Sequence, residues 1–371
     1  MQKITYVTRP ALPALDELIP SLEKIWASGI LTNNGSFHRT FEDELAKFLG
    51  VKFVSLFTNA TIALLTSIKY LNLSPNDEII TTPFSFIATS HAILWNNIKP
   101  VFVDINPLNY NINPKKIEES ITSKTKAILA VHCFGIPADV KAIEKIAAQY
   151  NLKVIYDAAH AFGVDCHCGS LLNHGDMSIL SFHATKVFNT FEGGAIITND
   201  ENVKISLEEL KNFGHNGETS VINTGINGKM SEFNAALGLL QLKHVDEYIT
   251  KRKIIFEVYQ SGLKSVNGIN VVSIDNIQKY NFSYMPISVT NKFPISRDEL
   301  HEALKTIGIY SRRYFYPLIT DFSMYQIYQS LKKNDLKNAK SASEQVLCLP
   351  IYPDLELSVV DEIISFISSM K

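Results

Sequence analysis

Short runs of apolar and β-branched residues alternate with amphipathic segments over the first 200 or so positions of the chain. Parallel strands that are buried on both faces are apolar almost throughout, and these runs have that character. Their alternation with helical patterns is typical of an α/β protein with a mainly parallel central sheet. We predict strands at Val51–Phe57, Glu78–Thr81, Pro100–Asp104, Ala127–Cys133, Val154–Asp157, Met177–Phe182 and Ala195–Thr198.

Apolar residues at helical spacing predict helices between these strands. One pattern follows the first strand, and another precedes the strand that begins at Val154. A longer helix is expected to begin after Ser231, whose hydroxyl suits an N-cap. The apolar stripes of the three helices are Ile62, Leu65, Ile68 and Leu71; Val140, Ile143, Ile146 and Ala147; and Phe233, Ala236, Leu237, Leu240 and Val245.

The pattern changes after about Lys253. Two short strand-like runs, Val271–Ser273 and Met285–Val289, and a helical pattern at Arg297–Thr306 predict a smaller α+β unit. A chain of 371 residues is also longer than one hydrophobic core usually supports. We therefore predict a large domain at 1–250 and a small C-terminal domain at 251–371.

Composition excludes several classes of protein. Hydrophobic residues make up 46% of the chain and charged residues 19%, which is ordinary for a globular protein. The net charge of −2 does not favour a nucleic-acid-binding surface. The N-terminus has no apolar signal segment, and no apolar run is long enough to cross a membrane. We expect a cytoplasmic protein without a nucleic-acid or membrane partner.

The four cysteines are too few for a disulfide framework and are expected to be reduced. Cys166-His167-Cys168 resembles a fragment of a metal site. A structural zinc site needs about four ligands in paired clusters, and no second cluster follows. The expectation at this stage is that the chain binds no metal.

Lys186 lies in the most informative segment, Ser181-Phe-His-Ala-Thr-Lys-Val-Phe-Asn-Thr-Phe-Glu-Gly-Gly194. A single lysine is usually solvated on the surface. Here it follows a strand that ends at Phe182 and precedes a turn of small residues, and Asp157 ends another predicted strand. Functional sites of α/β proteins lie at such strand ends, so Lys186 is a candidate for chemistry.

A lysine and a buried carboxylate are the pair that pyridoxal phosphate (PLP) requires. A lysine that forms a Schiff base needs an unprotonated amine, which burial favours. PLP accepts electrons well only while its pyridine nitrogen is protonated, and a neighbouring carboxylate holds that proton. Asp157 is the candidate, although an aspartate at a strand end can also simply cap the following helix.

At this point the residues resemble a known family. Asp157-Ala-Ala-His-Ala-Phe-Gly163, Ser181-Phe-His-Ala-Thr-Lys186 and Glu192-Gly-Gly-Ala195 are similar to the sugar-nucleotide aminotransferases of the DegT/DnrJ type. These belong to the PLP-dependent transferases of fold type I, which are like aspartate aminotransferase. The resemblance extends from the loop at 31–35 to the segment Leu349-Pro-Ile-Tyr-Pro353, and so covers essentially the whole chain.

The resemblance implies a role for each matching residue. Lys186 carries the cofactor and moves the proton between cofactor and substrate carbons, and Asp157 pairs with the pyridine nitrogen. His160 binds the ring oxygen of the cofactor, and Ser181 binds its phosphate. Phe86 stacks on the pyridine ring, although the apolar segment around it also allows plain core packing.

Two further segments of the resemblance concern the phosphate. The loop Thr58-Asn-Ala60-Thr61 lies between a strand and a helix, where backbone N–H groups and the Thr61 hydroxyl suit a phosphate. Many family members have glycine where Ala60 stands, so alanine would be strained if φ were positive there. Asn227 matches an asparagine that reaches the cofactor phosphate of a neighbouring subunit, which implies a homodimer with shared active sites. Lys229 stands where arginine is common, so its role stays open.

The resemblance also indicates the substrates. Arg312, Tyr314 and Tyr316 suit the phosphates, sugar and base of a nucleotide sugar, but they also fit an ordinary turn. The expected reaction moves an amine from L-glutamate to C4 of dTDP-4-keto-6-deoxy-D-glucose for O-antigen or other cell-surface glycans. Amination at C3, or of the galacto epimer, is the alternative. For His183 three roles stay open: assistance in proton transfer, contact with the substrate, and a structural hydrogen bond.

Two other classes are less favoured. PLP-dependent sugar dehydratases of the same family have histidine where this chain has Lys186. A DNA-binding regulator would need an added basic module, for which the chain has no spare segment.

Overall fold

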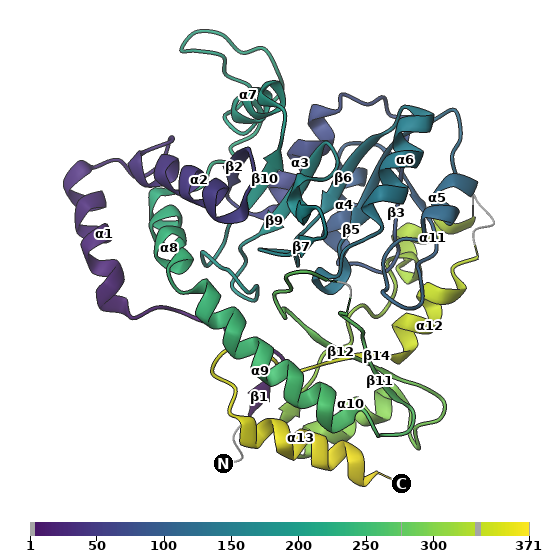
Figure 1. The fold of residues 1–371 in the computed structure, drawn as a ribbon. Coiled ribbons are helices and arrows are strands. Elements are labelled where there is room, and N and C mark those ends of the chain that lie inside the picture. The colour runs from purple at the N-terminus through teal and green to yellow at the C-terminus, as the bar shows by residue number, and fades with distance from the viewer. Residues whose placement is uncertain (1–3, 276, 331–334, 371) are drawn as a thin grey trace.

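The computed structural model describes residues 4–275, 277–330 and 335–370. A seven-stranded sheet occupies the centre of the larger part of the molecule (Figure 1). All its neighbouring strands are parallel except at β10, which runs antiparallel to both its neighbours. In spatial order the strands are β2 (Phe53–Phe57), β10 (Gly194–Thr198), β9 (Met177–Ser181), β6 (Lys153–Asp157), β5 (Thr125–Val131), β3 (Glu78–Thr81) and β4 (Lys99–Phe102).

Neighbouring residues of the central strands pack on opposite faces of this sheet, as strand geometry requires. Ile79 and Leu129 belong to one buried apolar cluster, whereas Ile80 and Ile128 belong to the other. The first cluster lies under α3 (Ala60–Tyr70), α4 (Ile87–Trp95) and α7 (Glu201–Leu210). The second lies under α2 (Ser36–Leu49), α5 (Pro114–Glu119), α6 (Val140–Tyr150) and α8 (Glu232–Leu242).

The C-terminal part contains a smaller antiparallel sheet in the order β11 (Ile269–Val271), β12 (Met285–Val289) and β14 (Val346–Leu349). Four helices accompany it: α9 (Val245–Leu263), α10 (Arg297–Thr306), α12 (Lys337–Gln345) and α13 (Leu357–Ser369). The helix α11 (Ser323–Ser330) packs against β4 of the central sheet. Short 3₁₀ turns lie at η1 (Cys133–Gly135), η2 (Leu171–Asn173) and η3 (Ile319–Asp321).

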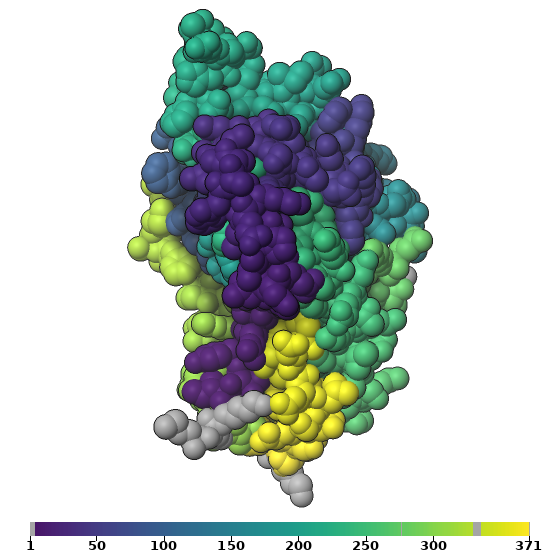
Figure 2. Space-filling view, turned by 90° about the vertical axis from the view of Figure 1, so that its left-hand side faces the viewer, coloured from purple at the N-terminus to yellow at the C-terminus, as the bar shows by residue number. Residues whose placement is uncertain are grey.

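The N-terminal segment joins the two parts of the molecule. β1 (Thr5–Tyr6) pairs in parallel with β13 (Ile309–Tyr310), and the Ile351 N–H donates to the carbonyl of Val7 at 3.0 Å. The following helix, α1 (Leu15–Ser28), packs on α8 of the larger part. Figure 2 shows this segment in purple along one side of the molecule, reaching the yellow C-terminal helix.

The predicted α/β class and all seven predicted strands are confirmed, with ends that differ by one or two residues. The helix after Ser231 begins as expected, because the Asn234 N–H donates to the Ser231 hydroxyl at 3.2 Å. The prediction of one long helix that includes Val245 was wrong. The chain closes α8 at Leu242 and starts α9 at Val245, where Asp246 and Glu247 favour a helix N-terminus.

The division at residue 250 stays a prediction, and α9 runs through that position. Over the described ranges, each helix is too short or too polar to cross a bilayer.

Candidate active site

A cavity of about 580 Å³ lies at the carboxyl ends of β5, β6 and β9. The parallel strands deliver Val131, Asp157 and Ser181 to this edge of the sheet, and the N-terminus of α3 borders it. Aromatic residues of the C-terminal part line the other side, so the cavity lies between the two parts of the chain. Its lining includes Asn59, Ala60, Thr61, Ser85, Phe86, His160, His183, Thr185, Lys186, Glu192, Tyr284, Tyr314 and Phe315.

Lys186 follows β9 and lies half-buried in this cavity. Its amine donates a hydrogen bond of 3.3 Å to the Tyr284 hydroxyl. Burial lowers the pKa of the Lys186 amine to about 8, against the opposing effect of the Asp157 charge. About a tenth of the amine is therefore neutral and nucleophilic at pH 7, far more than for an unshifted lysine, and covalent binding of a carbonyl requires this neutral form.

Asp157 lies at the base of the cavity with its carboxylate held by neighbours. The Thr89 hydroxyl donates to Oδ2 at 2.7 Å, and the Ala159 N–H donates to Oδ1 at 3.2 Å. Burial raises the pKa of Asp157, and these hydrogen bonds and the Lys186 charge oppose that rise. A protonated ring nitrogen beside Asp157 would offset the cost of burying the carboxylate.

His160 is buried beside the cavity in a neutral state. The Phe134 N–H donates to its Nδ1 at 3.2 Å, so Nδ1 accepts and the proton lies on Nε2. Burial lowers the pKa of His160 well below its usual value, and the Lys186 charge acts in the same direction. His160 is thus a neutral donor toward an acceptor in the cavity.

The N-terminus of α3 offers unpaired backbone N–H groups to the cavity. The Asn59 side chain caps the helix by accepting from the Ile62 N–H at 2.9 Å, which leaves the first N–H groups free for a ligand. Ala60 is the first helical residue and does not have a positive φ, so alanine is unstrained there. A Cβ at Gly194 would lie 2.6 Å from the Ala60 nitrogen, so glycine is what lets β10 approach this helix end.

Phe86 borders the cavity with 62% of its surface exposed. Core packing is therefore not its role. An aromatic ring that is exposed in the same cavity as the carboxylate of Asp157 suits stacking on a flat ring.

Three predicted site residues are not among those that line this cavity. Asn227 is exposed and pairs through its backbone with Asn212. Arg312 is exposed and pairs through its backbone with Cys348. The ring of Tyr316 lies over the guanidinium groups of Arg297 and Arg313, at 4.8 and 5.0 Å from the ring centroid.

The sequence profile of the DegT/DnrJ/EryC1/StrS aminotransferase family matches residues 15–368. The chain belongs to this family. It is similar to the "dTDP-4-amino-4,6-dideoxy-D-glucose transaminase" of Shigella dysenteriae, with 51% identity over the whole of both chains. The protein of the same name from Escherichia coli is 51% identical over 96% of each chain. Among solved structures, DesI in the presence of its TDP-sugar product has a TM-score of 0.94 at 30% identity, covering 99% and 93% of the chains.

As a DegT/DnrJ family member the chain is an aminotransferase that uses PLP and acts on a nucleotide-linked sugar. The cavity fits this cofactor on its own chemistry. The lysine, whose pKa burial lowers, suits the aldehyde, and the buried carboxylate suits the pyridinium nitrogen. The neutral histidine suits the ring oxygen as a donor, and the exposed aromatic ring suits stacking on the flat ring. The helix N-terminus suits the phosphate.

Two residues that contact the Lys186–Asp157 pair were not expected from the sequence: Tyr284 and Thr89. Tyr284, which contacts Lys186, lies 98 positions away from it and has no local signal. Thr89 lies four positions after Ser85 in a buried helical segment, and hydroxyls at that spacing were a usable sign of a buried polar partner. Ser85 extends this network, with its hydroxyl 2.8 Å from that of Thr89.

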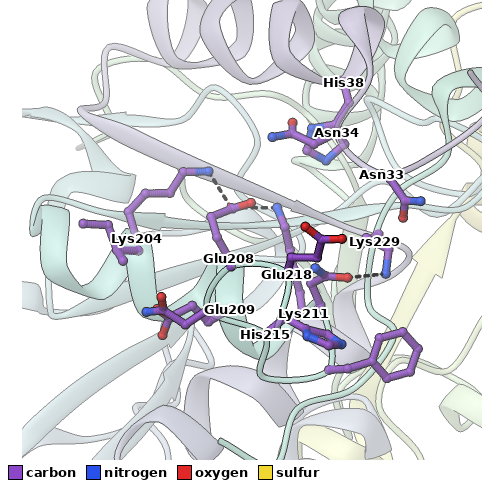
Figure 3. A pocket seen from close by; sticks show the side chains of 15 residues that line it. Asn33, Asn34, His38, Lys204, Glu208, Glu209, Lys211, His215, Glu218 and Lys229 are labelled. Atoms are coloured by element: carbon purple, nitrogen blue, oxygen red, sulfur yellow. Dashed lines mark hydrogen bonds and ion pairs between the residues drawn. The ribbon is translucent and has the colours of Figure 1, made fainter. Parts of the chain in front are cut away.

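A second cavity of about 920 Å³ lies beside α7 and the loop that follows it, on the side of the molecule that carries Lys229 (Figure 3). The Lys229 amine donates to Asn212 Oδ1 at 2.9 Å. Glu208 binds Lys204 at 2.6 Å and Lys211 at 2.7 Å, and Figure 3 shows the three in a row. Burial favours the neutral form of Glu208, but the two lysines lower its pKa to about 2. Lys229 lines this second cavity and is not among the residues that line the Lys186 cavity of its own chain.

Proposed function

We propose that this aminotransferase moves an amino group from L-glutamate to C4 of dTDP-4-keto-6-deoxy-D-glucose, with 2-oxoglutarate and dTDP-4-amino-4,6-dideoxy-D-glucose as products. The observation that supports this best is the 51% identity, over the whole chain, with a transaminase named for that product. The Lys186–Asp157 pair in one cavity supports transfer of an amine rather than dehydration, because the dehydratases lack the lysine.

Each residue of the cavity has a proposed part in this reaction. When bound, PLP supplies a carbonyl group for the incoming amine and an electron sink for the carbanion that forms. Lys186 would hold the cofactor through its amine, and the same amine would carry a proton between two carbons. Asp157 holds a proton at the pyridine nitrogen, His160 donates to the ring oxygen, and Phe86 orients the ring.

The phosphate is proposed to bind at the N-terminus of α3, with Ala60, Thr61 and Ser181 as its neighbours. The support is that all three line the cavity, with Ala60 and Thr61 as the first residues of α3 and Ser181 at the end of β9. His183 and Tyr314 line the same cavity and are proposed to contact the sugar. That Arg312 and Tyr316 bind the nucleotide remains a prediction.

We further propose a cytoplasmic homodimer that serves cell-surface glycan synthesis. Asn227 supports the dimer, because it is exposed and lines neither cavity of its own chain. Its proposed partner is the cofactor phosphate of the second subunit.

The direct test incubates the enzyme with PLP, L-glutamate and a panel of dTDP-, UDP- and GDP-linked 4-ketosugars and 3-ketosugars. We expect 2-oxoglutarate to form with dTDP-4-keto-6-deoxy-D-glucose, and NMR to place the amine at C4 with gluco configuration. An amine at C3, or a product with galacto configuration, would show that the enzyme makes a different amino sugar from the one proposed. Loss of hydroxyl without any need for glutamate would contradict transamination.

A further inference from the structure

Two cysteines and a histidine meet at the hairpin β7 (Asp165–Cys166) and β8 (Gly169–Ser170), outside the Lys186 cavity. Cys166 Sγ lies 2.7 Å from Cys168 Sγ. His174 Nε2 lies 3.2 Å from Cys168 Sγ and 3.5 Å from Cys166 Sγ. Three ligand atoms that soft metals prefer are thus gathered at one point.

The third ligand is not apparent from the sequence, because no second cluster of ligand residues follows Cys166 and Cys168. The 3₁₀ turn η2 brings the chain back so that His174, six positions after Cys168, faces both sulfurs.

His174 is also oriented as a metal-binding histidine is. Its Nδ1 lies 2.8 Å from Glu144 Oε1 on α6, which leaves Nε2 pointing to the sulfurs. The Gly175 N–H donates to the same carboxylate oxygen at 3.2 Å and holds it in place. A carboxylate behind a histidine fixes its tautomer and strengthens it as a ligand.

The spacing suits a tetrahedral ion after a small adjustment. Around Zn²⁺, with bonds of about 2.3 Å to sulfur and 2.0 Å to nitrogen, two sulfurs lie about 3.8 Å apart and sulfur and nitrogen about 3.5 Å. The two sulfur–nitrogen distances are already close to this. The sulfurs must separate by about 1 Å, and the exposed Cys168 in the hairpin turn has room to move.

We propose that Cys166, Cys168 and His174 bind one Zn²⁺ ion, with solvent as the fourth ligand. Binding converts two thiols to thiolates and releases their two protons. The ion would tie the hairpin to the start of β9, in the segment that joins Asp157 of β6 to Ser181 of β9. The site lies apart from the cofactor cavity, because none of its three ligands lines that cavity.

The test uses untagged, PLP-bound enzyme that is stripped of metal under reducing conditions and titrated with Co²⁺ and then Zn²⁺. We expect about one Co²⁺ per chain with a thiolate-to-cobalt absorption band, displacement by Zn²⁺, and release of about two protons per ion by calorimetry in two buffers. Zn²⁺ should raise the Tm by about 2–4 °C.

Matched variants identify the ligands. Cys166→Ser, Cys168→Ser and His174→Ala should each abolish the stoichiometric binding, and Glu144→Gln should weaken it about 10- to 100-fold. His167→Ala, at the exposed neighbour between the cysteines, should bind as the unchanged protein does. Absence of the cobalt–thiolate band in the unchanged, folded enzyme would overturn the proposal. So would a Cys166–Cys168 disulfide in enzyme purified without reductant, or a loss of binding in His167→Ala equal to that in His174→Ala.

Discussion

Burial shifts three titratable groups of the Lys186 cavity away from their usual states. It lowers the pKa of Lys186 to about 8, lowers that of His160 well below its usual value, and raises that of Asp157. All three shifts disfavour charge on these groups, and none of the three forms an ion pair with another described residue; the ion pair in the cavity joins His183 and Glu192 at 3.7 Å. A bound cofactor with a cationic ring nitrogen and an anionic phosphate supplies the missing charges.

Replacing Lys186 by alanine should abolish transamination and leave the fold intact. The amine is half-buried and has one hydrogen bond, so its loss removes chemistry rather than core packing. We expect turnover to fall by at least about a thousandfold, because the covalent and proton-transfer roles are lost together. Steady-state kinetics measures the fall, and Lys229→Ala is the matched control. Near-normal turnover in Lys186→Ala would refute the assignment.

Capture of PLP by the apoenzyme should depend on pH through Lys186. A lysine whose pKa is lowered to about 8 is charged below that pH and becomes neutral as pH rises through it. The rate should therefore rise about eightfold between pH 6.5 and 7.5 and level off above about pH 9. Stopped-flow absorbance measures this rate, with Nα-acetyl-lysine as the control. A rate that climbs to pH 10 in both would show that burial does not shift the amine.

Among the elements, helix ends are completed by residues far away in the sequence. Gly35 precedes α2 and has no side chain to cap it. Glu232 of α8 does so instead, accepting from the Phe37 and His38 N–H groups at 2.9 Å each. The N-terminus of α3 is completed differently, because Gly194 of β10 lies directly against it.

Replacing Gly194 by alanine should weaken phosphate binding. The added Cβ would lie 2.6 Å from the Ala60 nitrogen and 2.7 Å from the Asn59 carbonyl carbon, and backbone atoms cannot rotate away. We expect a loss of about 1–3 kcal/mol in unfolding free energy and at least tenfold weaker PLP binding. Chemical denaturation and fluorescence titration measure the two. Pyridoxal, which has no phosphate, should bind about equally to both proteins; an equal loss for pyridoxal would contradict a phosphate-specific effect.

At the scale of the whole molecule, the site depends on both parts of the chain. The sheet supplies Asp157, Ser181 and Lys186, and the C-terminal part contributes Tyr284 and Phe315 as the opposite wall. The Phe315 ring stacks parallel to the His160 ring, with centroids 6.0 Å apart. The packing of the two parts thus sets the shape of the cofactor cavity.

Mixing two inactive variants tests whether subunits share sites. If Asn227 serves the partner's cofactor, a dimer of one Lys186→Ala chain and one Asn227→Ala chain retains one intact site. Co-expression should then restore about a quarter of the normal activity, since half of random dimers are mixed. Mixed dimers that are present by mass spectrometry but inactive would contradict shared sites. Mixing Lys186→Ala with Asp157→Asn, which alter the same site, is the control and should restore nothing.

Local pattern was enough for the α/β class, the seven central strands and the pairing of Lys186 with Asp157, whereas the other cofactor contacts were expected from the family resemblance. Strand and helix periods are encoded over a few residues, and the parallel strands bring Asp157 and Ser181 to one edge of the sheet. It was not enough for the break between α8 and α9, because the apolar stripe of α8 continues into Val245 and does not mark the end of the helix.

Only the tertiary structure decided contacts between distant segments. Tyr284 reaches Lys186, Glu232 caps α2, and His174 joins Cys166 and Cys168 because packing brings separate elements together. Arg312 and Tyr316 are not among the residues that line the cavity with Tyr314: the Arg312 backbone pairs with Cys348, and two guanidinium groups lie over the Tyr316 ring. The chemistry of single segments is local and readable along the chain, whereas the completion of a site depends on contacts that no local pattern encodes.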